Sequence, residues 1–202
     1  MRKTFYVHGQ RAAWRWKMTA EELSNKHELL KELLDKLRLD DAGRLVLGDV
    51  PMIITDREFI ALIQKVAEEV LGERGAATIM YRAGYISAHS FSEAHAKLFG
   101  IGGFDILRKY LELASVRGWW SKHEIVELSE EPLRVVVRFW HTVAEEWGDV
   151  GRPVCHMWRG GLAGILRYIA ESMGKKVEIR VRETACVAKG DPYCEMVAEA
   201  MG

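Results

Sequence analysis

The sequence predicts an α+β protein in which several helices pack against an antiparallel sheet. Two patterns support this fold class. Apolar residues recur at helical spacing through most of the first half of the chain, whereas much of the second half alternates at strand spacing. Helices that come first and strands that come later are typical of α+β proteins rather than of repeated βαβ units. With 202 residues the chain is long enough to bury one sizeable core.

The first helix is predicted by a capping box. Thr19 is followed three residues later by Glu22, which predicts a helix over about residues 19–39. Its apolar stripe, expected to face the core, consists of Leu23, Leu30, Leu34 and Leu37. Short extended segments are then expected around the turn at Gly48-Asp49.

A second capping pair, Thr55 with Glu58, predicts a helix that ends near Leu71. The residues expected to face inward are Phe59, Ile63, Val66 and Val70. Gly72 and Gly75 break this helix.

Two further helices are expected, over about residues 76–99 and 104–116. The second of them has one apolar face, formed by Phe104, Leu107, Leu111 and Ala114. A β-hairpin over 119–128 and 132–142 should then turn at Glu130-Glu131-Pro132, because apolar and basic residues alternate along its second half.

A long helix is predicted from Pro153 to about Gly174, since proline is well placed in a first helical turn. Its apolar stripe consists of Cys155, Trp158, Leu162, Ile165, Ile169 and Met173. Two strands follow, over about 176–184 and 193–199.

Strict alternation places a carboxylate on the inward row of the first of these strands. Glu183 shares a face with three valine and isoleucine residues, and a buried carboxylate is costly unless something pairs with it. Cys194 faces inward on the next strand, and Cys186 lies in the turn between the two. Cys155, near the start of the long helix, completes a group of three thiols and one carboxylate. Its place in the first turn should favour a thiolate.

Such a set suits a closed, four-coordinate zinc site. The alternative is that the cysteines are small buried apolar residues, which free cysteines often are. All three lie after residue 150, and a clustered odd number favours metal binding over a disulfide framework.

Three segments resemble the 4-vinyl reductase (4VR) domain: Pro153-Val154-Cys155-His156, then Arg159 to Gly164, and then Arg182 to Glu195. Tyr81 to Tyr85 resembles the family's earlier glycine-centred helix more weakly. The family includes the sensory domains of aromatic-responsive transcription activators, and its fold is similar to that of nitric-oxide sensors and of TRAPP subunits of Golgi transport.

The resemblance implies that Cys155, Glu183, Cys186 and Cys194 bind a structural zinc ion, since the Glu-x2-Cys-x7-Cys spacing is intact. It also implies an apolar cavity for a small hydrophobic or aromatic ligand beside the zinc. The candidate cavity residues are Trp120, His123, Trp140, His141, Trp158 and Tyr168. Each of them could instead be ordinary packing.

The function predicted is that of a zinc-stabilised sensor or regulatory protein, expected to be a cytoplasmic homodimer. Residues 1–50 are expected to form an N-terminal extension with an amphipathic helix, and residues 51–202 the 4VR-like domain. Signalling would then pass through a protein partner or through the chain's own oligomer, since no Walker-type loop is present.

Other functions remain open. A redox sensor could release zinc when its thiolates are oxidised. A reductase of tetrapyrrole metabolism, or an enzyme with Cys155 as nucleophile and His156 or His141 as base, is less favoured because no dinucleotide fingerprint is present and metal binding would consume the thiolate.

Composition argues against nucleic acid and membranes as partners. Basic and acidic residues balance at 29 each, and no apolar run is long enough for a membrane span. The exception is residues 1–17, where basic and aromatic side chains alternate without an acid. A structural or dimer-exchanged segment is favoured there over a nucleic-acid arm.

Overall fold

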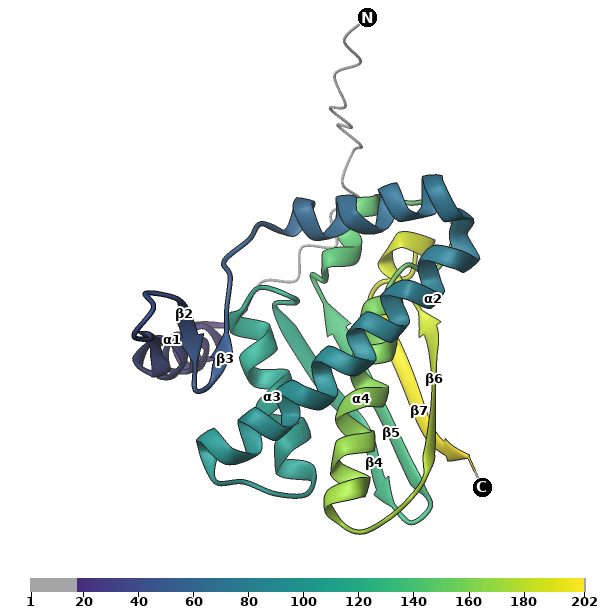
Figure 1. The fold of residues 1–202 in the computed structure, drawn as a ribbon. Helices are drawn as coiled ribbons and strands as arrows, with labels where there is room; N and C mark the ends of the chain where they lie inside the picture. The colour runs from purple at the N-terminus through teal and green to yellow at the C-terminus, as the bar shows by residue number, and fades with distance from the viewer. Residues whose placement is uncertain (1–17, 202) are drawn as a thin grey trace, which may run out of the picture.

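The computed structural model describes residues 18–201, so the predictions about the basic segment at 1–17 lie outside the described residues. Helices pack on one face of a four-stranded antiparallel sheet, and a small three-stranded sheet lies beside the first helix (Figure 1). The predicted α+β class with an antiparallel sheet is confirmed.

The N-terminal elements are α1 (Ala20–Lys36), β1 (Leu37–Leu39), β2 (Leu45–Leu47) and β3 (Val50–Pro51). The capping box is present as predicted: the Thr19 hydroxyl accepts from the backbone N–H of Glu22, and the Glu22 carboxylate accepts from that of Thr19. The helix ends earlier than predicted, at Lys36, because the chain continues directly into β1.

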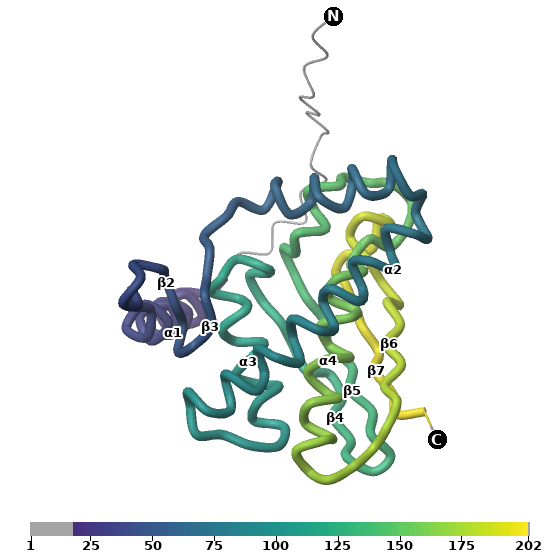
Figure 2. The backbone as a smooth tube through the Cα atoms, in the orientation of Figure 1, coloured from purple at the N-terminus to yellow at the C-terminus, as the bar shows by residue number. Residues whose placement is uncertain are grey.

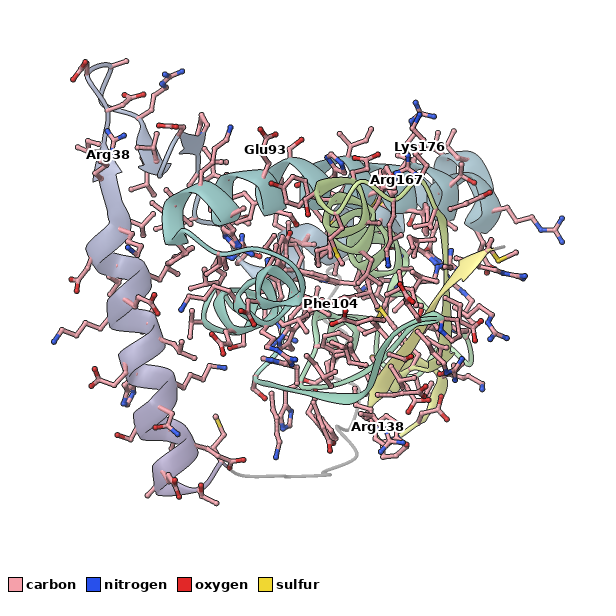
Figure 3. The ribbon with its side chains drawn as sticks, turned by 90° about the horizontal axis from the view of Figure 1, so that it is seen from below. Arg38, Glu93, Phe104, Arg138, Arg167 and Lys176 are labelled. Atoms are coloured by element: carbon pink, nitrogen blue, oxygen red, sulfur yellow. The ribbon has the colours of Figure 1, made fainter. Side chains whose placement is uncertain are left out.

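The predicted inward stripe of α1 is wrong. Leu23, Leu30 and Leu34 are exposed, and the buried leucine is Leu33. Polar contacts attach the helix instead: the Lys26 ammonium donates to the Ser121 carbonyl at 2.7 Å, and further ion pairs join Lys109 with Glu32 and Lys122 with Glu22. In the view from below, α1 stands as a rod beside the rest of the molecule (Figure 3).

Helix α2 (Arg57–Phe99) is one element bent at Gly72, whose φ of 71° and ψ of 165° are not helical. Only glycine adopts such a backbone readily. The bend confirms the predicted break and divides α2 into a first arm, residues 57–71, and a second arm, residues 73–99. The N-cap is Asp56 rather than Thr55, and its carboxylate accepts from the backbone N–H of Phe59 at 2.7 Å.

The first arm of α2 faces the opposite way from the prediction. Its apolar residues Phe59, Ile63, Val66 and Val70 are 45–74% exposed. The buried residues of this arm are Ala61 and Gln64. Amphipathic spacing thus located the stripe correctly but assigned it to the wrong surface.

The second arm of α2 crosses α4 (His156–Ser172) at very close range (Figure 2). The crossing is lined by Gly84, Gly160 and Gly164. A Cβ atom added at Gly160 would lie 1.9 Å from the Tyr81 carbonyl oxygen, so only glycine permits this approach.

Helix α3 (Phe104–Val116) has the predicted bounds, and the residues of its predicted face are buried except Phe104, which is partly buried. The main sheet contains β4 (Lys122–Glu130), β5 (Leu133–Trp140), β6 (Glu178–Ala185) and β7 (Cys194–Met201), in the order β4-β5-β7-β6. Two 3-10 helices, η1 (Val143–Trp147) and η2 (Val187–Lys189), flank the candidate site.

Register places the inward row of the sheet as predicted. Phe139 pairs with Cys194 and Glu183 pairs with Met196. Arg138 and Glu195 form an ion pair on the opposite face. Among residues 18–201, the search for a helix both long and apolar enough to cross a membrane finds none.

Candidate functional site

Four side chains from four different places in the fold converge at one end of the main sheet. Cys155 is the N-cap of α4, Glu183 lies near the end of β6, Cys186 precedes η2, and Cys194 begins β7. One ligand atom from each residue lies within 4.8 Å of all the others. The cluster predicted from the sequence is therefore assembled, and it could hold a metal ion.

The sulfur positions match a tetrahedral metal site. The Sγ atom of Cys194 lies 3.6 Å from that of Cys155 and 3.9 Å from that of Cys186. Zinc–sulfur bonds of about 2.3 Å at tetrahedral angles would separate two sulfurs by roughly 3.8 Å. The donors present fit a single zinc ion.

The carboxylate supplies the fourth ligand position. Oε2 of Glu183 accepts from the backbone N–H of Cys155 at 3.1 Å. Oε1 is buried and has no hydrogen-bond partner within residues 18–201. A buried oxygen left without a partner is unfavourable, and a cation at the centre of the cluster would satisfy it.

Local backbone contacts explain why Cys186 reaches this site. The pairing of β6 with β7 shifts between Glu183 and Ala185, so the chain leaves the regular ladder just before Cys186. The backbone N–H of Cys186 then donates to Asp191 Oδ2 at 2.8 Å, and Gly190 closes the turn in the left-handed conformation. This turn folds Cys186 back over the start of β7, where it is fully buried.

The charges of the metal-free cluster are strongly coupled. Burial, followed by the neighbouring Cys186, raises the pKa of Glu183 to about 9. The pKa of Cys155 is raised, chiefly by its contacts with Cys186 and Cys194, whereas contacts with Cys155 and Cys186, Cys155 first, lower the pKa of Cys194. The predicted thiolate at Cys155 is therefore wrong for the metal-free protein, because the sulfur contacts outweigh its position at the helix start.

An apolar cavity of about 30 Å³ shares a wall with this cluster. Cys155 and Cys194 line both the cavity and the candidate metal site. The first arm of α2 covers the cavity with Ile60 and Gln64. The remaining side chains come from the second arm of α2, from the segment after α3, from β5, β7 and η1, and from α4.

Three tryptophans bring unpaired donors to this cavity. Trp120, Trp147 and Trp158 all line it, and the indole N–H of each is buried without a hydrogen-bond partner in the described part of the chain. Indole N–H groups usually find a partner when they are buried. The ring centroids of Trp120 and Trp158 lie 4.4 Å apart.

Of the six candidate cavity residues predicted from the sequence, the structure places Trp120 and Trp158 in the cavity wall. The ring of His123 contacts Trp120 from one side, at 6.3 Å between centroids. The ring of Trp140 lies against Tyr193. The remaining two, His141 and Tyr168, contact Glu145 and His89 respectively. These four side chains do not line the cavity.

The prediction missed several wall residues. Phe139 and Met196 could have been found from strand alternation, because both share the inward row with Cys194. Thr142 and Trp147 had no such signal, since they belong to the irregular segment around η1.

Comparison with protein families identifies the part of the chain that contains the cluster. Residues 140–200 match the 4VR domain, which confirms the resemblance drawn from the sequence over this part. Residues 34–126 match a domain of unknown function (DUF5943). No curated protein sequence matches the chain.

Solved structures share the fold. The phenol-responsive sensory domain of the transcription activator PoxR, crystallised with phenol, matches with a TM-score of 0.72 and 21% identity over 91% of this chain and 92% of that chain. A vinyl-4-reductase family protein from Methanocaldococcus jannaschii matches with a TM-score of 0.52 and 16% identity over 94% and 99%.

Weaker matches include the two other expected neighbours. An H-NOX protein from S. oneidensis has a TM-score of 0.47 and 16% identity over 90% and 97%. A trafficking protein particle complex subunit 3 from Naegleria fowleri has a TM-score of 0.46 and 12% identity over 72% and 95%.

Proposed function

We propose that this chain is a zinc-stabilised sensor or regulatory domain that binds a small hydrophobic or aromatic molecule. One observation carries the proposal: the metal-competent cluster and the tryptophan-lined cavity share Cys155 and Cys194 as a common wall. The metal would hold β6, β7 and α4 together, and the cavity would receive the ligand.

Zinc is the metal that suits this donor set best. Three thiols and one carboxylate match its preference for sulfur and oxygen in a closed tetrahedral site. All four positions are supplied by protein, so zinc would act here by cross-linking the fold. Three cysteines kept reduced as metal ligands suit the cytoplasm.

The ligand should be mainly apolar and carry a hydrogen-bond acceptor. The cavity wall is apolar, yet three indole N–H groups lie in it without partners among the described residues. A small aromatic alcohol fits both conditions, and the PoxR sensory domain, whose fold this chain shares, responds to phenol. A cavity that accepts benzene measures about 150 Å³, so the 30 Å³ cavity must enlarge when the ligand enters.

The exposed apolar stripe on the first arm of α2 supports the proposed homodimer. Phe59, Ile63, Val66 and Val70 follow one another at helical spacing and remain exposed. Exposed apolar patches of this kind mark interaction sites. A Val66→Glu variant should sediment as a monomer where the wild type sediments as a dimer; an unchanged species would show that this face is not the interface.

A redox sensor is the second candidate. The sulfur separations of 3.6 and 3.9 Å would allow a disulfide to form if zinc were lost to an oxidant such as peroxide. Zinc release by mild peroxide, accompanied by a change in secondary structure that thiol reductant reverses, would favour this function. A site that keeps its zinc under peroxide would exclude it.

The first experiment is elemental analysis of the purified protein beside two variants. The wild type should hold about one zinc per chain. Cys186→Ala should lose zinc and unfold at lower temperature. The control is Glu178→Gln, an exposed carboxylate on the same strand as Glu183, which should keep its zinc. A wild type free of metal would remove the basis of the proposal.

A further inference from the structure

Thr142 contacts the candidate metal site, the cavity and the cover of the cavity at once. It follows β5 and caps η1, and its side chain is almost completely buried and lines the cavity. Its Oγ1 accepts from the backbone N–H of Ala144 at 3.2 Å and lies 3.3 Å from the Sγ atom of Cys194.

The direction of the contact with Cys194 follows from hydrogen-bond chemistry. A threonine hydroxyl has one proton, and the bond from Ala144 uses one of its lone pairs, so the proton is available to the sulfur. A metal-bound cysteine is a thiolate and can only accept. With metal bound, the Thr142 hydroxyl therefore donates to Cys194 and orients that ligand.

The backbone of Thr142 is held from the other side by Arg57, in the first turn of α2. The Arg57 guanidinium donates to the carbonyl oxygens of both His141 and Thr142. The left-handed backbone at His141, with a φ of 53°, turns the chain at this point. Arg57 belongs to the first arm of α2, the arm that covers the cavity with Ile60 and Gln64.

We propose that Thr142 is a positioning residue that couples the closure of the cavity to metal retention. The inference rests on the proposed zinc site. When the first arm of α2 is closed, Arg57 fixes the Thr142 carbonyl, and the hydroxyl holds the Cys194 thiolate. When a ligand enlarges the cavity and displaces the arm, this support is lost. Because coupling between two sites is reciprocal, zinc in turn favours the closed arm.

The test is the rate of zinc transfer from the intact protein to an excess of a chromophoric chelator. Thr142→Val keeps the shape of the side chain and removes the hydroxyl. Loss of a hydrogen bond to a metal ligand typically costs about 10–100-fold in metal affinity, so zinc should leave this variant correspondingly faster. Thr142→Ser, which keeps the hydroxyl, should stay close to wild type.

Arg57→Met tests the second half of the coupling. It should speed zinc loss in the same direction as Thr142→Val but less, because the hydroxyl remains. The matched control is Arg74→Met, an exposed arginine of the same helix beyond the Gly72 bend, and it should behave as wild type. If Arg57→Met and Arg74→Met release zinc equally, the closed arm has no influence on the metal.

A spectroscopic measurement separates positioning from a general loss of stability. In cobalt-substituted protein, removal of the Thr142 hydrogen bond should shift the thiolate-to-cobalt charge-transfer band to longer wavelength, and serine should restore it. A Thr142→Val protein with wild-type spectrum and release rate overturns the inference while zinc binding stands. A wild type that holds no zinc overturns the proposed function instead, and the inference with it.

Discussion

Glu183 is joined to Cys155 through one carboxylate oxygen only: Oε2 accepts the backbone N–H of Cys155 at 3.1 Å. The other oxygen, Oε1, is buried and has no hydrogen-bond partner among residues 18–201. This contact ties the end of β6 to the start of α4. It also leaves one oxygen available for a metal at the centre of the three sulfurs.

The first prediction concerns pH. In the metal-free protein the pKa of Glu183 is raised from 4.5 to about 9, so the folded state holds a proton that the unfolded chain releases above pH 4.5. The contribution of Glu183 to stability is then fully present below pH 4.5 and is lost as the pH rises towards 9. Zinc has to displace this proton and those of the thiols, so its affinity should rise by about tenfold or more per pH unit. Competition with a chelator at pH 6, 7 and 8 measures it, and a flat profile would contradict the assignment of the ligands.

Glu183→Gln should separate the fold from the metal site. Glutamine is neutral and nearly isosteric, so the metal-free variant should be at least as stable as metal-free wild type at pH 8, with a weaker dependence on pH. Its affinity for zinc should fall, because an anionic ligand is lost. Thermal unfolding with and without zinc measures both effects. Glu178→Gln serves as the exposed control, and equal zinc stabilisation in the two variants would remove Glu183 from the ligand set.

The helix crossing gives a prediction that does not depend on the metal. Alanine at Gly160 would place its Cβ atom 1.9 Å from the backbone oxygen of Tyr81, so α2 and α4 must move apart. The expected loss is about 1–3 kcal/mol in the free energy of unfolding. The control is Gly102→Ala, where nothing lies within 4 Å. Urea unfolding of both variants measures the difference; a Gly160→Ala protein as stable as the control would show that the helices relax without cost.

The elements of the fold were largely predictable from the sequence, whereas the orientation of two helices was not. The capping box at Thr19, the bounds of α3 and the inward row of the sheet follow from local patterns. The apolar stripes of α1 and of the first arm of α2 were assigned to the core but are exposed. An amphipathic pattern shows that a helix has an apolar face, but it cannot show whether the partner of that face belongs to the same chain.

The cluster could be found from the sequence because alternation along β6 places Glu183 inward. The cavity could be predicted only in part. Trp120 and Trp158 line it, but His141 lies beyond the end of β5, where a left-handed backbone breaks the alternation on which its placement relied. Trp147 reaches the cavity from a 3-10 helix, for which no periodic pattern exists.

His95 should make the protein sensitive to acid. Its side chain is almost fully buried, and its ring packs among Phe91, Phe99 and Tyr110. Burial, helped by Arg117 and Lys109, lowers its pKa from 6.5 to about 3. The unfolded chain therefore takes up a proton below pH 6.5 that the folded chain refuses, and stability falls as the pH drops from 6.5 towards 3. At pH 5 the loss from this residue is about 2 kcal/mol.

His95→Phe keeps an aromatic ring in this position and removes the titration. The free energy of unfolding should then fall less between pH 7 and pH 5 than in wild type, by about 2 kcal/mol. Urea denaturation at the two pH values measures it. His27→Phe makes the same substitution at an exposed position of α1 and should leave the wild-type pH dependence intact. Identical pH dependence in both variants would show that His95 takes up its proton without unfolding.

Trp158 provides a test of the ligand chemistry. Phenol and toluene have similar size, but only phenol has an oxygen that can accept from a buried indole N–H. A neutral hydrogen bond contributes about 0.5–1.5 kcal/mol, so wild type should bind phenol roughly 2–12-fold more tightly than toluene. Trp158→Phe keeps an aromatic wall and removes the donor, and the ratio should fall towards one. Trp140→Phe, whose ring lies against Tyr193 outside the cavity, should keep it. Calorimetric titration gives both affinities. A wild type that binds toluene as tightly as phenol would mean that the unpaired indole N–H groups play no part in recognising the ligand.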